Sequence, residues 1–137
     1  MSERKKFIIN PKTKIGHIHL TVSDLQRSLA FYRGILGFEV MYWWEDKTAV
    51  FLSAGGYHHH IALNIWYGKK GPPPPGYTGL FHFAILLPNK KELAKVVKRV
   101  IDAGRSVTVQ DHGANIAVYL SDPDGNGIEL SIDRPEK

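Results

Sequence analysis

Residues 15–37 read IGHIHLTVSDLQRSLAFYRGILG, and the spacing of their apolar side chains changes within the stretch. In the first eight residues apolar and polar side chains alternate, which is typical of a half-buried strand. From Leu25 onward the apolar residues recur at helical spacing, and Gly37 supplies a stop. Ser23 with Gln26 forms a possible capping box at the start of this helix. The stretch therefore predicts a strand followed by a helix.

Three strand-like segments follow the predicted helix. They lie near residues 38–44, 48–53 and 59–66, and a charged turn and a Gly-Gly turn separate them. The first part of the chain therefore has the element order β-α-β-β-β. A run of prolines comes next, and we expect an extended linker or surface loop at about residues 69–78.

The same order of elements begins again after the prolines. Residues 79–87 (GLFHFAILL) predict a strand, and Asn89 with Glu92 predicts the cap of a second helix. This helix runs to about Ala103, and Gly104 stops it. Three short strands are then predicted at residues 107–110, 115–120 and 127–132, with an Asp-Pro-Asp-Gly turn before the last of them.

The repeated order predicts an α+β fold in which two βαβββ modules form curved mixed sheets around a metal cleft. We expect an N-terminal tail at residues 1–14 and a single domain at residues 15–135. Within that domain, module one spans about residues 15–68 and module two about residues 79–135. The first and last strands of a module can lie side by side, so that side chains from both converge in the cleft.

The composition excludes several classes of site. The 137 residues suffice for one domain with a real core, and none is cysteine, which excludes disulfides, thiolate metal sites and cysteine nucleophiles. No apolar run has the length of a secretory or membrane segment, so we expect a cytoplasmic protein without a membrane partner. The net charge of +5 comes mainly from the tail and one predicted helix, where lysines serve as a solvated face. We therefore expect no nucleic-acid partner.

Two histidines occupy equivalent positions in the two modules. His17 lies on the first strand of module one and His82 on the first strand of module two, while Glu129 interrupts the apolar last strand. A carboxylate on such a strand needs a cation or hydrogen bonds, and an arginine is the ordinary alternative to a metal. Two histidines and one carboxylate leave coordination positions open, as in non-haem Fe(II) oxygenases. A strand histidine that only forms hydrogen bonds is the other open interpretation of His17.

Further polar and aromatic side chains are candidates for acid–base chemistry. In the run His58, His59 and His60, strand alternation places the first and third on one face and the second on the other, and a polar strand edge is an equally good interpretation. Tyr119 precedes Glu129 by ten positions and could stand on the neighbouring strand, with His112 in the loop before it. A core aromatic residue and a loop histidine are the alternatives for these two.

Five segments form a pattern that covers nearly all of residues 15–135. They read GHIHLTVSDLQRSLAFYRGILGFEV, AGGYHHHIALNIW, GLFHFAILLP, DHG and YLSDPDGNGIEL. Together they resemble the vicinal-oxygen-chelate superfamily, particularly its catechol 2,3-dioxygenase-like branch. The resemblance implies that His17, His82 and Glu129 are metal ligands and that Tyr119 is catalytic, because extradiol dioxygenases of this superfamily carry a tyrosine ten residues before the metal glutamate.

The implied activity is extradiol cleavage of a catechol-like aromatic diol by O2. Fe(II) is the expected metal, and Mn(II), Ni(II) or Zn(II) are alternatives. His59 or His60 would transfer protons, Tyr119 would hydrogen-bond the reacting group, and His112 matches another histidine of the cleft. Relatives of this size commonly form homodimers, in which a site lies within one chain or combines residues of two subunits.

Other branches of the superfamily remain as alternatives. Glyoxalase I contributes a further glutamate from the strand that here reads Ile61-Ala62-Leu63-Asn64-Ile65, and fosfomycin-resistance enzymes carry a threonine where this chain has His19. A metal-dependent isomerase or thiol transferase is nevertheless the rival enzyme, and a small-molecule sequestering protein is the rival of another class.

Overall fold

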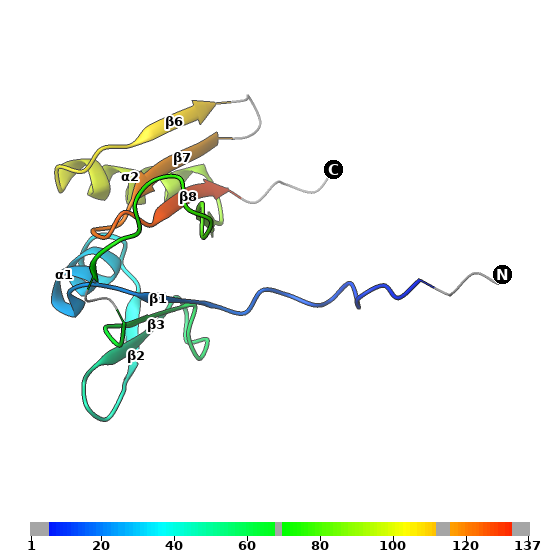
Figure 1. The fold of residues 1–137 in the computed structure, drawn as a ribbon. Helices are drawn as coiled ribbons and strands as arrows, with labels where there is room; N and C mark the ends of the chain where they lie inside the picture. The colour runs from blue at the N-terminus through cyan, green and yellow to red at the C-terminus, as the bar shows by residue number, and fades with distance from the viewer. Residues whose placement is uncertain (1–5, 68–69, 112–115, 133–137) are drawn as a thin grey trace.

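The computed structural model describes residues 6–67, 70–111 and 116–132. The chain forms two four-stranded sheets, each accompanied by helical segments (Figure 1). The strands of the first sheet, in spatial order, are β1 (Ile18–Thr21), β4 (Ile61–Asn64), β3 (Ala49–Ser53) and β2 (Glu39–Trp43). The strands of the second are β5 (Phe83–Leu87), β8 (Gly127–Ile132), β7 (Ile116–Ser121) and β6 (Thr108–Asp111).

The two sheets have the same topology. In each, the first and last strands of the module lie side by side in parallel, β1 with β4 and β5 with β8, and the other neighbours are antiparallel. Between the first two strands of each module comes a helical segment. It is α1 (Leu25–Leu29), continued by the π-helical segment η1 (Ala30–Ile35), in the first module and α2 (Lys90–Asp102) in the second. The predicted α+β fold of two βαβββ units is confirmed.

A nearby side chain caps the N-terminus of each α-helix, and one of the two predicted caps needs correction. Asn89 caps α2 as predicted, since its Oδ1 accepts from Glu92 N at 2.9 Å. The prediction of Ser23 as the cap of α1 is wrong: Asp24 caps this helix and accepts from Arg27 N at 2.9 Å. Ser23 has a tertiary partner instead, because its hydroxyl donates to Asp124 of the second module.

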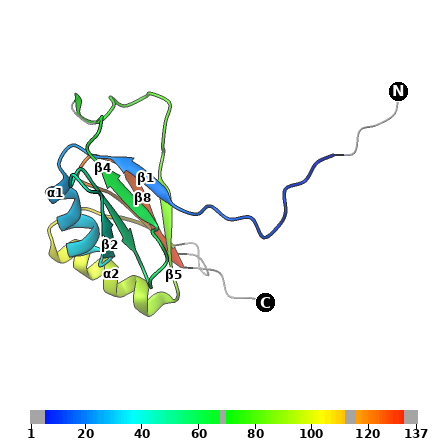
Figure 2. The same ribbon diagram turned by 90° about the horizontal axis from the view of Figure 1, so that it is seen from below.

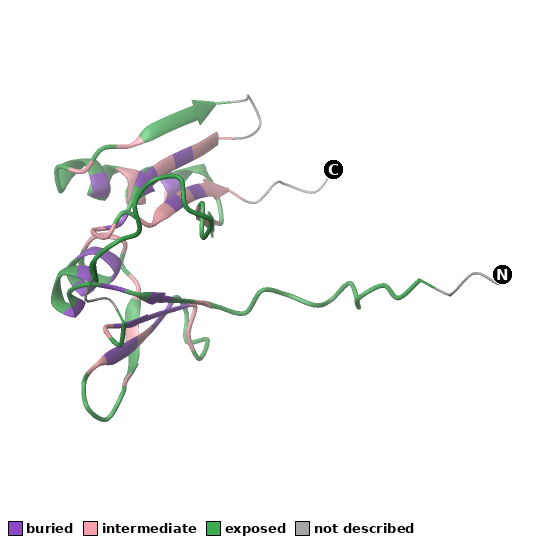
Figure 3. Ribbon diagram, in the orientation of Figure 1, coloured by how far each residue is buried: buried purple, intermediate pink, exposed green. Residues whose placement is uncertain are grey.

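One apolar core joins the two modules. It includes Leu20 and Leu52 of the first sheet and Val118 and Leu130 of the second, all buried. Because strand side chains alternate, the residues between these core positions lie on the opposite face of each sheet. We call that face of the first sheet, which carries His19, the outer face of module one, and the equivalent face of the second sheet the outer face of module two. Each outer face points away from the shared core, and half-buried positions alternate with buried ones along parts of β7 and β8 (Figure 3).

A buried hydrogen bond ties the modules together. The hydroxyl of Tyr32 in η1, a fully buried residue, donates to Asp122 Oδ2 at 2.7 Å across 90 positions of sequence. Asp122 also accepts from Asp124 N and Asn126 N, so that one carboxylate shapes the turn before β8 and holds it against η1. Burial, and next the charge of Asp122, raise the pKa of the Tyr32 phenol well above its ordinary value.

Residues 6–14 extend away from the body of the molecule (Figures 1 and 2). They contain neither helix nor strand, and Phe7 is 87% exposed. Within the described part of the chain, no helix is long and apolar enough to cross a membrane.

Candidate metal centre

His82 and Glu129 meet at the start of two parallel strands. His82 immediately precedes β5, Glu129 lies in β8, and His82 Nε2 is 3.0 Å from Glu129 Oε1. Ile128 and Leu130, on either side of Glu129, are fully buried, so alternation turns the carboxylate to the outer face of module two. Both polar side chains are partly shielded, with 29% and 22% of their surfaces exposed. Among the described residues, the partner of Glu129 is therefore a histidine, and no arginine of that part of the chain is paired with it.

Tyr119 completes this cluster. It lies in β7 directly opposite Glu129 in the β7–β8 pairing, and its ring centroid is 5.6 Å from that of His82. The prediction that Tyr119 stands on the strand neighbouring Glu129 is confirmed. A hydroxyl donor, an imidazole and a carboxylate thus gather on one outer face.

The separation of His82 and Glu129 fits two ligands of a single ion. Histidine nitrogens and carboxylate oxygens bind first-row divalent metals at about 2.1 Å, and two such atoms at right angles around one ion lie about 3.0 Å apart. The His82–Glu129 contact has this length. Nitrogen and oxygen donors without any thiolate suit Fe, Mn, Ni or Zn. The residues of module two therefore fit part of a metal site.

His17 belongs to a separate cluster on the first module. It immediately precedes β1, the place that His82 has before β5, and its ring centroid lies 4.2 Å from that of His59 and 6.3 Å from that of His58. His59 in turn packs edge to face on Phe51 of β3, at 5.0 Å between centroids. His17 and His59 thus lie together at the outer face of module one.

The predicted alternation within the histidine run is wrong. His58, His59 and His60 come before β4 rather than within it, so strand geometry does not assign their faces. His58 and His59 contact each other, with their Nδ1 atoms 3.1 Å apart. His60 turns elsewhere, and its Nδ1 accepts from Ala54 N at 3.1 Å. Of the two proposed acid–base histidines, His59 is the one whose ring packs against the ring of His17.

Electrostatics favour the neutral imidazole at His19 and His59. Partial burial, and next the neighbouring His17, lower the pKa of His19 and of His59. His19 is also held by an amide, since Asn64 Nδ2 donates to His19 Nε2 at 2.8 Å. Asn64 is a functional candidate that the sequence interpretation did not single out; its signal is a polar end on the otherwise apolar strand β4.

The three predicted metal ligands are not assembled within one chain. Among the described residues, no group of three histidine, aspartate or glutamate side chains could hold one ion. His82 and Glu129 lie together, while His17 lies in the other module, and His112 falls outside the described residues. The two outer faces point away from a shared core. The outer face of module one therefore carries only His17 of the three predicted ligands, and the outer face of module two carries His82 and Glu129.

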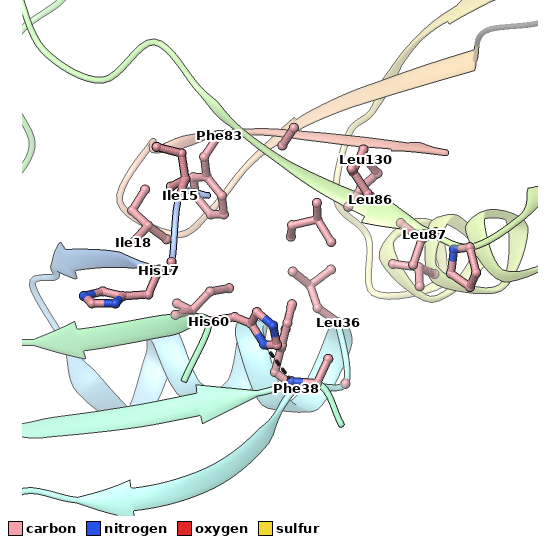
Figure 4. A pocket seen from close by; sticks show the side chains of 18 residues that line it. Ile15, His17, Ile18, Leu36, Phe38, His60, Phe83, Leu86, Leu87 and Leu130 are labelled. Atoms are coloured by element: carbon pink, nitrogen blue, oxygen red, sulfur yellow. Dashed lines mark hydrogen bonds between the residues drawn. The ribbon is translucent and has the colours of Figure 1, made fainter. Parts of the chain in front are cut away.

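The cavity between the modules does not bring the predicted ligands together and is lined mainly by apolar residues. A crevice of about 660 Å³ opens there, and Figure 4 shows Leu36, Phe83 and Leu130 around it with the ring of His17 at its edge. Neither Glu129 nor Tyr119 lines this crevice. It is a gap in hydrophobic packing, and His17 and His60 are among the residues that line it, whereas the cluster of His82, Glu129 and Tyr119 lies outside it.

Comparison with known proteins assigns the chain to a family. Residues 14–130 match the model of the Glyoxalase/Bleomycin resistance protein/Dioxygenase superfamily. The chain is 49% identical over 106 residues to a catechol-2,3-dioxygenase of Bacillus subtilis, a match that spans 77% of this chain and 37% of that protein. It is 32% identical over 125 residues to biphenyl-2,3-diol 1,2-dioxygenase 3 of Rhodococcus globerulus, spanning 88% of this chain and 63% of that protein. A glyoxalase/dioxygenase structure from Nostoc punctiforme shares the fold, with a TM-score of 0.71 at 22% identity over 98% of this chain and 100% of that one. The chain belongs to the glyoxalase/bleomycin resistance/dioxygenase superfamily.

Proposed function

We propose that this protein is a metal-dependent dioxygenase that cleaves a catechol-like aromatic diol with O2, using Fe(II). The observation that carries the proposal is the cluster of His82, Glu129 and Tyr119, in which two ligand-type atoms lie at coordination spacing beside a phenol. Two relatives at 49% and 32% identity bear the names of diol dioxygenases, which supports the same reaction class. The chain spans 37% and 63% of the lengths of these two relatives.

We further propose that the metal site forms between two copies of the chain. His17 of one copy and His82 with Glu129 of the other copy would then be ligands of the same ion. The outer face of module one in each copy would meet the outer face of module two in the other. Exposed apolar residues beside the second face, such as Phe81 (87% exposed) and Leu86 (59%), leave surface that association would bury. A symmetric dimer would contain two such sites.

The side chains have distinct roles in this proposal. A bound Fe(II) supplies an open coordination sphere on which a diol and O2 can be held together. His59, kept neutral by its lowered pKa, accepts a proton from a diol hydroxyl. The Tyr119 hydroxyl donates a hydrogen bond to charge that develops on the substrate oxygens.

The test combines metal analysis with oxygen consumption. The protein is purified anaerobically, its metal is quantified, and O2 uptake is followed with catechol together with the yellow ring-opened product. Iron with coupled uptake is the expected result. Zinc or nickel without uptake would refute the dioxygenase and favour an isomerase or thiol transferase, and diol binding that survives chelation without turnover would favour sequestration. A monomer that retains full activity would refute the shared site.

A further inference from the structure

Gly127, the first residue of β8, lies where two backbones come unusually close. A Cβ added to this glycine would be 2.3 Å from the carbonyl oxygen of Phe81 and 3.0 Å from the Cβ of His82. Gly127 does not have the positive φ that Gly125 adopts, so its backbone conformation is open to any residue. Space, rather than conformation, therefore requires a glycine at this position.

The backbone on the β8 side of this contact is restrained from both directions. Asn126, which precedes Gly127, donates from its backbone N and its Nδ2 to the carboxylate of Asp122, at 2.8 and 2.9 Å. Asp122 is buried and also accepts from the hydroxyl of Tyr32 in the first module. Ile128, which follows Gly127, is fully buried in the core. The start of β8 is therefore fixed in the fold.

The backbone on the other side of the contact is much less restrained within the chain. Residues 79–82 belong to no helix or strand, because β5 begins only at Phe83. Leu80 and Phe81 are 50% and 87% exposed. The backbone N–H groups of residues 80–82 form no hydrogen bond with any other residue in the described part of the chain. Of the two backbones that meet at Gly127, the one that carries His82 is therefore the one that can move.

A side chain at position 127 would act on the distance between His82 and Glu129. The contact with the Phe81 oxygen must open by at least about 0.7 Å before a Cβ fits, and the free backbone has to provide that displacement. Glu129 follows Gly127 by two residues in the restrained strand and stays in place. The separation of 3.0 Å between His82 Nε2 and Glu129 Oε1 therefore depends on the absence of a side chain at Gly127.

We propose that Gly127 is a positioning residue of the metal centre, which lets the backbone of His82 lie close enough to β8 for His82 and Glu129 to meet at coordination spacing. This inference rests on the proposed role of these two residues as ligands of one ion. Metal–ligand distances are confined to within about 0.2 Å, a much smaller range than the displacement that a methyl group imposes. Loss of a group that orients a ligand typically lowers metal affinity 10- to 100-fold.

The first experiment measures metal affinity without turnover. Calorimetric titration of the metal-free protein with Co(II) should show about 10- to 100-fold weaker binding in Gly127→Ala, although every ligand atom is still present. Gly34→Ala is the matched control, because a Cβ at Gly34 meets no atom within 4 Å and its φ is not positive. This control should bind Co(II) as the parent does. Urea unfolding of the metal-free proteins shows whether each variant is folded.

The second experiment detects the displacement of His82 directly. In NMR spectra of the metal-free protein, the ring signals of His82 are those that disappear in His82→Gln. Gly127→Ala should shift these signals and leave those of His19 and His60, in the other module, unchanged. A role of Gly127 in overall stability alone would not shift the signals of a single histidine ring.

The outcomes separate this inference from the metal centre on which it rests. Unchanged Co(II) affinity in Gly127→Ala, or unchanged His82 signals, would overturn the positioning role and leave the metal centre standing. A parent protein that binds no Co(II) would overturn the metal centre and the inference with it.

Hydrogen exchange in the metal-free parent protein provides a test that needs no variant, should Gly127→Ala fail to fold. The amides of residues 80–82 should exchange faster than those of Asp124 and Asn126, which donate to Asp122. Equal protection of the two groups would overturn the inference, because the backbone of His82 would then be restrained as firmly as the start of β8.

Discussion

Replacing Tyr32 by phenylalanine tests whether the buried hydrogen bond to Asp122 holds the two modules together. The ring stays, so packing in the core is preserved, and only the hydroxyl that donates to Asp122 Oδ2 at 2.7 Å is lost. A hydrogen bond to a charged group contributes about 1.5–3 kcal/mol. Asp122 keeps donors from Asp124 N, Asn126 N and Asn126 Nδ2, so its carboxylate is not left unpaired. We therefore expect the lower half of that range, about 1.5–2 kcal/mol.

For a chain of 137 residues, this loss corresponds to a fall in Tm of about 5–7 °C. Urea unfolding followed by circular dichroism measures the free energy directly, and Tyr77→Phe, at an exposed tyrosine, should leave it unchanged. A loss below about 0.5 kcal/mol would refute the reasoning, because an exposed or absent contact gives values of that size.

The same hydrogen bond should make the free energy of unfolding depend on pH in alkaline solution. Burial, and next the charge of Asp122, raise the pKa of Tyr32 in the folded protein, whereas a tyrosine in the unfolded chain loses its proton near pH 10. Above that pH the unfolded state binds fewer protons than the folded state, so the free energy of unfolding falls as pH rises. The stability difference between the parent protein and Tyr32→Phe should therefore be full below about pH 10 and shrink above it. A constant difference from pH 7 to 11 would contradict this assignment.

Three further substitutions test the site and the fold. Glu129→Ala should abolish metal retention, measured by metal analysis after gel filtration, because it removes the carboxylate that we propose as a ligand beside His82; unchanged iron content and activity would exclude Glu129 as a ligand. Tyr119→Phe should lower kcat about a hundredfold with iron still bound, since only the donor hydroxyl is lost; an unchanged kcat would exclude that role. Asn89→Ala should cost about 1 kcal/mol in urea unfolding by removing the cap of α2, without any change in metal content; a loss of metal would show that the helix end also supports the site.

Local sequence was sufficient for the parts of the fold that depend on neighbouring residues. The strand and helix periods, the stops at Gly37 and Gly104 and the cap at Asn89 all involve partners a few positions away, and both glycines adopt positive φ. The pairing of Tyr119 with Glu129 was predictable for the same reason: a short turn joins their strands and sets the register of the hairpin.

The directions of side chains outside the regular strands could not be predicted in this way. Alternation was applied to His58, His59 and His60, but these residues lie before β4, where the backbone does not have the period of a strand. Their side chains are placed by the neighbours that they meet, His17 and Phe51 for His59 and the backbone of Ala54 for His60. The cap of α1 was missed for a related reason, since Ser23 has a partner in the other module.

By itself, the sequence determined that two equivalent βαβββ units exist and which residues are candidates for metal binding and acid–base chemistry, because periodicity and residue type are local properties. Only the tertiary structure decided how these units meet. The core shared between the modules turns the outer face with His17 away from the outer face with His82 and Glu129, and the contact of Tyr32 with Asp122 spans 90 positions. Such arrangements depend on the packing of residues that lie far apart in the chain. Local sequence patterns contain no information about that packing.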